Sequence, residues 1–106
     1  MRFVIALLLH GSFAFAARAQ EPGDPARGHT YAERHCAQCH GILPTERISP
    51  RSGLATFKTI AETPGMTGIA ISVWLRTPHD LMPNLFIEAD DRANVIAYII
   101  SLREPR

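Results

Sequence analysis

Two cysteines and a histidine stand together in the run Cys36-Ala37-Gln38-Cys39-His40. A C-x-x-C-H run is the pattern by which a haem is covalently attached. On a helical turn, two thiols three residues apart can each bond one vinyl group of the same porphyrin, and the histidine that follows lies beneath the iron. Because these are the only two cysteines, the motif predicts one haem c per chain. Electron transfer is the leading functional hypothesis.

The N-terminus has the form of a secretory signal peptide. Arg2 gives a positive start, residues 3–15 are almost wholly apolar, and Ala17-Arg18-Ala19 is a small-x-small cleavage site. The apolar run is shorter than the roughly 20 residues that a membrane-spanning helix needs. We expect residues 1–19 to be cleaved during export to a bacterial-type periplasm, where haem attachment takes place. An uncleaved anchor is the alternative.

The predicted mature chain, residues 20–106, is long enough for one small domain and contains no further apolar run that could span a membrane. A chain of this size buries only about 60–65% of the surface that its unfolded form exposes, so a haem would supply needed apolar surface. Loss of Arg2 and Arg18 leaves nine of the 11 Lys and Arg residues against ten Asp and Glu, a net charge of −1. This balance excludes a nucleic-acid-binding footprint.

The chain has no alternating strand pattern and no repeat, and its first two predicted segments are helical. Asp24-Pro25 has the form of an N-cap followed by proline at the first helical position, and it opens a helix that leads into the cysteines. A short helix is expected from about Ser52, with an apolar face ending at Ala61. Residues 63–65, Thr-Pro-Gly, stop it.

Two more helices are expected in the second half of the chain. One runs from about Thr67 until Pro78 pushes the preceding residue out of helical geometry. The other begins with an acidic turn at residues 88–91, and Arg103 lies in its last turn. Its apolar residues repeat at the i, i+3, i+4, i+7 spacing: Val95, Tyr98, Ile99 and Leu102.

Met82, between the last two helices, is the predicted second ligand of the iron. A thioether favours reduced iron, and Met/His ligation raises the reduction potential of a haem. Pro83 biases Met82 toward an extended backbone, so the side chain is presented from a loop. The alternative is ordinary packing, since methionine is a common filler of apolar gaps.

With these residues in place, the mature chain resembles the small class I c-type cytochromes over nearly all of its length. The resemblance implies an all-α fold of three to five short helices around one haem, with the first and last helices crossing. It implies that Cys36 and Cys39 form thioethers, that His40 is the proximal ligand and that Met82 is the distal ligand. It also implies close helix approach at Gly28 and packing of Tyr31 against Tyr98.

The resemblance further implies an outer partner for His40. In this family a proline carbonyl often accepts the proton on the second ring nitrogen of the proximal histidine, which fixes the ring. Pro44 and Pro50 both fit, and we favour Pro50 because it precedes a turn, although the sequence leaves the choice open. Trp74 is expected either at the haem edge or as a core aromatic.

Other candidate ligands have simpler explanations. We expect Met66 to pack in the core, and His29 and His35 to be solvated surface residues. His79 offers bis-histidine ligation as an alternative to Met82, with a lower potential.

The cysteine pair also has readings without haem. It could be a thiol redox centre, although it comes late in its helix and lacks a βαβ context. It could hold zinc, which usually needs four ligands, or it could form a plain disulfide. In the last case His40 is left unexplained.

The functional hypotheses differ in the sixth position of the iron. With His40 and Met82 both bound, no substrate binds, and the chain is an electron carrier rather than an enzyme, with redox proteins as donors and acceptors. One alternative is a haem subunit of a periplasmic dehydrogenase or terminal oxidase. Another is a small-ligand sensor or peroxidase with an open sixth position, for which no distal acid–base pair is evident.

Overall fold

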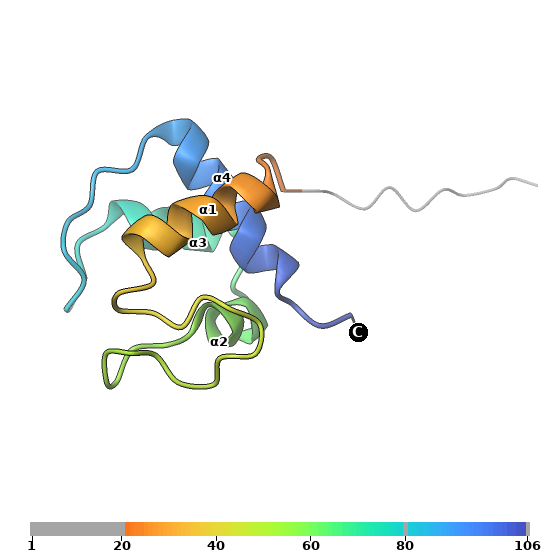
Figure 1. Cartoon of the computed structure of the whole chain (residues 1–106). Coiled ribbons are helices and arrows are strands. Elements are labelled where there is room, and N and C mark those ends of the chain that lie inside the picture. Colours follow the sequence, from red (N-terminus) through yellow and green to blue (C-terminus); the bar gives the residue numbers. More distant parts are fainter. Residues whose placement is uncertain (1–20, 80, 106) are drawn as a thin grey trace, which may run out of the picture.

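Four helices make up the regular structure of the chain, in a computed structural model that describes residues 21–79 and 81–105. Their order is α1 (Pro25–His35), α2 (Phe57–Glu62), α3 (Gly68–Arg76) and α4 (Ala89–Ser101), as Figure 1 shows. These described residues form no β-strand, so the prediction of an all-α fold is confirmed. None of these helices is long and apolar enough to cross a membrane. The predicted signal peptide, residues 1–19, lies outside the described residues.

Helix α1 begins where its cap was expected. The Asp24 side chain accepts hydrogen bonds from the backbone N–H groups of Ala26 at 2.8 Å and Arg27 at 3.4 Å, and Pro25 occupies the first helical position. A carboxylate at this place satisfies amides that have no partner within the helix. The aspartate also anchors the helix to α4, because its backbone N–H donates to Asn94 Oδ1 at 2.8 Å.

Helix α2 is shorter than predicted, since it begins at Phe57 and not near Ser52. Gly53 has a φ of +82°, a left-handed conformation that no α-helix contains. The true N-cap is Thr56, whose hydroxyl oxygen accepts from the Thr59 N–H at 3.1 Å. Helix α3 has the predicted bounds, with Thr67 as its N-cap.

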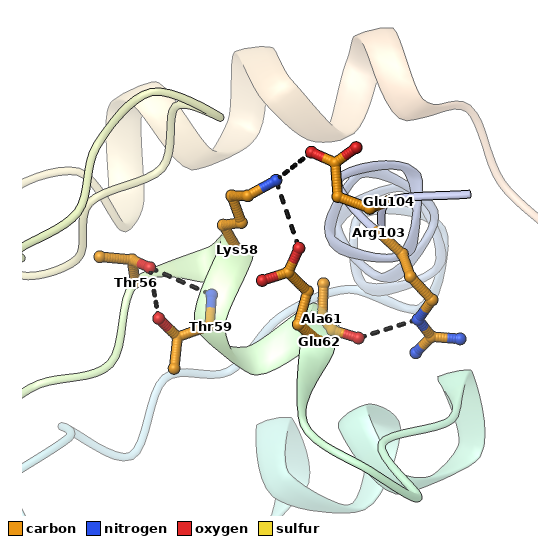
Figure 2. Close-up of polar contacts among 7 residues, drawn as sticks. All are labelled: Thr56, Lys58, Thr59, Ala61, Glu62, Arg103 and Glu104. Atoms are coloured by element: carbon orange, nitrogen blue, oxygen red, sulfur yellow. Dashed lines mark hydrogen bonds and ion pairs between the residues drawn. The ribbon is translucent and has the colours of Figure 1, made fainter. Parts of the chain in front are cut away.

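The prediction that Arg103 lies in the last turn of α4 is wrong, because α4 ends at Ser101. The Arg103 guanidinium instead donates to the carbonyl of Ala61 at 2.8 Å and to the carbonyl of Met66 at 2.6 Å. Figure 2 shows the first of these bonds beside Lys58, whose ammonium group lies 2.6 Å from a Glu104 carboxylate oxygen. The segment after α4 is therefore hydrogen-bonded to α2 and to the turn that follows it.

Helix α4 is the centre of the core. It packs against α1, α2 and α3, and Figure 1 shows it crossing α1. Val95 and Ile99 are the largest fully buried side chains, in agreement with the apolar spacing predicted for this helix. The buried cluster around them consists of Ala32, Ile42, Phe57, Ala61, Ile71, Val95, Ile96, Tyr98 and Ile99.

The crossing of α1 and α4 is tightest at Gly28. A Cβ atom at this position would overlap the carbonyl oxygen of Asn94 and would lie 2.8 Å from Tyr98 Cβ. Real Cβ atoms do not approach other atoms so closely, and here most of the neighbouring atoms belong to rigid backbone. The close helix approach expected at Gly28 is confirmed.

Gly28→Ala should lower the free energy of unfolding by about 1–3 kcal/mol, because the added methyl group forces the two helices apart. Helix propensity alone would give a change of opposite sign, a gain of roughly 1 kcal/mol. Chemical denaturation of the purified protein measures the difference.

Gly68→Ala is the matched control, since it also lies in a helix. There the added methyl would meet the Glu21 carboxylate, which is the end of a flexible side chain and can move away. We expect no loss of stability from this variant. Equal losses in the two variants would contradict the close approach at Gly28.

Candidate functional site

The motif residues share one helical turn at the end of α1. Cys36 caps that helix, and its N–H donates to the carbonyl of Ala32 at 2.8 Å. Its own carbonyl accepts from the N–H of Cys39 at 3.1 Å and from the N–H of His40 at 2.9 Å. Residues at i, i+3 and i+4 of such a turn lie on the same side of it. The three motif residues thus belong to one hydrogen-bonded turn.

A backbone carbonyl holds the imidazole of His40. Its Nδ1 atom lies 2.7 Å from the carbonyl oxygen of Ala55. Because a carbonyl can only accept, Nδ1 carries the proton and donates it, which leaves the lone pair on Nε2. An imidazole fixed in this way is prepared to bind a metal ion through Nε2.

The expectation that Pro44 or Pro50 supplies this carbonyl is wrong in the structure. Both prolines are exposed in the loop that follows the motif. The Phe57 N–H donates to the carbonyl of Gly41 at 2.8 Å, and this bond draws the start of α2 alongside the residue after His40. Ala55, two residues before Phe57, is thereby brought within reach of the ring.

Both cysteines are free, partly buried thiols, so the disulfide alternative is not what the structure contains. Burial, and secondarily the neighbouring Cys39, raises the pKa of the Cys36 thiol to about 11. A thiol redox centre needs a lowered pKa, so this environment is unfavourable for one. Over residues 21–79 and 81–105, no three His, Cys, Asp or Glu side chains gather into a group that could hold a metal ion. The zinc alternative therefore gains no support there.

Met82 lies in the loop between α3 and α4, apart from the motif in sequence. Its N–H donates to the carbonyl of His79 at 3.2 Å and closes a tight turn. Leu81, inside that turn, has a φ of +65°, a left-handed conformation that costs a branched side chain free energy. Figure 1 shows this loop on the left, on the same side of the view as the C-terminal end of α1. Met82 is partly buried, and its role as a ligand stays a prediction.

Trp74 and His79 form an aromatic pair next to this loop. Their rings meet edge to face with centroids 5.0 Å apart, and His79 Nδ1 lies 2.9 Å from the carbonyl oxygen of Thr77. The indole is 52% exposed, so the reading of Trp74 as a core aromatic is wrong. Its position at a haem edge stays a prediction.

The aromatic residues of α1 and α4 have partners other than those expected. The resemblance implied that Tyr31 packs against Tyr98, but the Tyr31 ring lies 4.3 Å from the ring of His35. The Tyr98 ring meets His29 edge to face at 5.0 Å and lies 6.3 Å from Phe57. Tyr31 nevertheless packs against the buried cluster to which Tyr98 belongs. His29, in contact with Tyr98, is therefore only partly solvated, with 33% of its side chain exposed.

The two remaining expectations about competing ligands are confirmed. Met66 packs against the buried cluster, as an apolar gap filler would. His35 is exposed at the end of α1.

The donor set fits a covalently bound haem. It consists of two free thiols three residues apart, one imidazole whose Nε2 lone pair is available, and a thioether in a loop. Large apolar side chains near these donors in sequence are exposed to solvent, including Leu43 at 41% and Leu81 at 63%. A haem uses both features, because its iron binds donor atoms and its porphyrin ring packs against apolar side chains.

Comparison of the chain with models of known families, with curated proteins and with solved structures gave no match. The functional argument therefore rests on the site itself. Sequence reasoning missed Ala55 and Phe57, which hold His40 from the other side of a loop. A backbone carbonyl has no sequence signature. The one local signal that could have placed the start of α2 near Ala55 is Thr56, a residue type that favours the N-cap position.

The pKa of Cys36 can be measured in the haem-free chain, made in reduced form without residues 1–19 and verified as helical by circular dichroism. The rate at which iodoacetamide alkylates Cys36 should rise about tenfold per pH unit up to a pKa of about 11, because only the thiolate reacts. At pH 7 only about one Cys36 side chain in ten thousand should be a thiolate.

The Cys39→Ser variant assigns this profile to Cys36 and removes the secondary cause of the shift, so its pKa should be slightly lower. An apparent pKa below about 7 would instead favour the thiol redox reading.

Proposed function

We propose that this chain is a periplasmic electron-transfer protein that carries one covalently attached haem c. Redox proteins are its electron donors and acceptors, and the chain itself is not an enzyme. The observation that carries the proposal is the hydrogen-bonded turn from Cys36 to His40, which contains two free thiols and one imidazole oriented by a backbone carbonyl. The signal peptide predicted at residues 1–19 supports the compartment.

Each donor has a distinct role in this proposal. Cys36 and Cys39 hold the porphyrin through two thioether bonds, and His40 binds the iron through Nε2. The bond from His40 Nδ1 to the Ala55 carbonyl keeps the ring in the required tautomer and increases the electron density on Nε2. A haem supplies a one-electron couple when it is bound, and Met/His ligation places its potential high in the range.

Met82 is the proposed ligand on the other side of the iron. Its turn is closed by the hydrogen bond to His79 and is followed by Pro83, which has no backbone N–H and a fixed φ. Both features limit the motion of the thioether. A ligand held in one place keeps the site similar in both oxidation states, as a carrier needs.

Met82→Ala tests this assignment in the full chain, exported from a bacterium that attaches haem to C-x-x-C-H motifs. The oxidised wild-type protein should show the sulfur-to-iron charge-transfer band, and the variant should lose it and bind carbon monoxide when reduced. Mass spectrometry of the wild type should give a polypeptide that begins at Gln20 with the mass of one haem added.

Met66→Leu is the matched control, because Met66 packs against the core and should leave the band unchanged. A band that survives Met82→Ala would remove Met82 from the ligand set. A polypeptide mass without haem would overturn the whole proposal, and carbon monoxide binding by the wild type would favour an open sixth position.

A further inference from the structure

Tyr98 reaches from α4 to the segment that follows the haem motif. Its hydroxyl donates to the carbonyl oxygen of Ile42 at 2.7 Å. Tyr98 is 8% exposed and Ile42 is 4% exposed, so this hydrogen bond lies in the core. A buried carbonyl that loses its donor is costly, because water does not replace the bond. The tyrosine hydroxyl therefore fixes the backbone at a point two residues after His40.

Gly41, which lies between His40 and Ile42, forms hydrogen bonds through both its N–H and its carbonyl group. Its N–H donates to Ser49 Oγ at 3.0 Å, and its carbonyl accepts from the Phe57 N–H at 2.8 Å. A Cβ atom at Gly41 would lie 3.0 Å from Thr56 Cγ2, which shows how closely the segment is packed against the start of α2. A change at Ile42 is thus transmitted to His40 without a flexible link between them.

The rings of Tyr98 and His40 are also connected through a third ring. Phe57 lies between them, with its centroid 6.3 Å from Tyr98 and 5.8 Å from His40. Phe57 is 4% exposed, so its ring is held in place by the core around it. The imidazole is bounded by this ring and, at Nδ1, by the Ala55 carbonyl.

We propose that Tyr98 is a positioning residue for the iron ligand His40, acting through the Ile42 carbonyl and the Phe57 ring. The inference rests on the proposed function, since it assumes that His40 binds the iron. It assigns α4 a role beyond packing: the helix sets the orientation of the imidazole plane.

Tyr98→Phe tests this role in the exported, haem-bearing protein, because it removes the hydroxyl and keeps the ring. The haem methyl proton resonances of the oxidised protein depend on the orientation of the axial ligand planes. We expect their pattern and the reduction potential to change while the sulfur-to-iron band persists. The thermal midpoint should fall by on the order of 5 °C through loss of one buried hydrogen bond.

Ser101→Ala is the matched control. It also removes a side-chain hydrogen bond to a backbone carbonyl in α4, from Ser101 Oγ to the carbonyl of Tyr98 at 2.6 Å, but it leaves the Tyr98 hydroxyl and its bond to Ile42 in place. This variant should lose stability and keep the methyl pattern of the wild type. Ser49→Ala, which releases the Gly41 N–H, should change the same resonances as Tyr98→Phe and serves if Tyr98→Phe does not fold.

An unchanged methyl pattern in Tyr98→Phe, with a midpoint lowered as in Ser101→Ala, would show that Tyr98 is only structural. If the haem methyl resonances of Ser49→Ala also remain as in the wild type, the proposal is overturned as well. Failure of the proposed function is a separate result, because a wild-type chain without haem has no such resonances.

Discussion

The close crossing of α1 and α4 is the constraint on which the rest of the structure depends. Gly28 has no side chain, so the backbone of α4 at Asn94 can approach it. Dispersion attraction falls steeply with distance, so this close approach strengthens the packing between the two helices. The Asp24 N–H, bonded to the Asn94 side chain, fixes the position along the helix at which this contact forms.

Helix α4 then organises the other elements from its remaining faces. Val95 and Ile99 are fully buried, and α2 and α3 pack against the same helix. The segment after it continues this function, because Arg103 donates to carbonyls in α2 and in the turn before α3. A domain this small buries a limited share of its surface, and here most of that burial involves one central helix that contacts every other helix.

The candidate site follows from this arrangement. Helix α1 ends in the turn that carries Cys36 and His40, and the start of α2 brings the Ala55 carbonyl to the imidazole. Two elements that both pack on α4 thus meet at one histidine. The loop with Met82 is different, since it is held by its own turn and exposes large apolar side chains such as Phe86, at 87%. The site therefore combines a rigid histidine side with a loop that depends more on local geometry.

The sequence by itself determined the features that rest on neighbouring residues: the all-α class, the cap of α1, the bounds of α3 and the one-sided spacing of Cys36, Cys39 and His40. Capping and helical periodicity act over a few residues, so they can be read along the chain. Only the tertiary structure decided which carbonyl holds His40, since the carbonyl that accepts its hydrogen bond belongs to Ala55, 15 residues further along the chain, and not to either proline. It also decided the role of Arg103, the exposure of Trp74 and the bond from Tyr98 to Ile42. These depend on segments that packing brings together, and no local pattern in the sequence encodes that proximity.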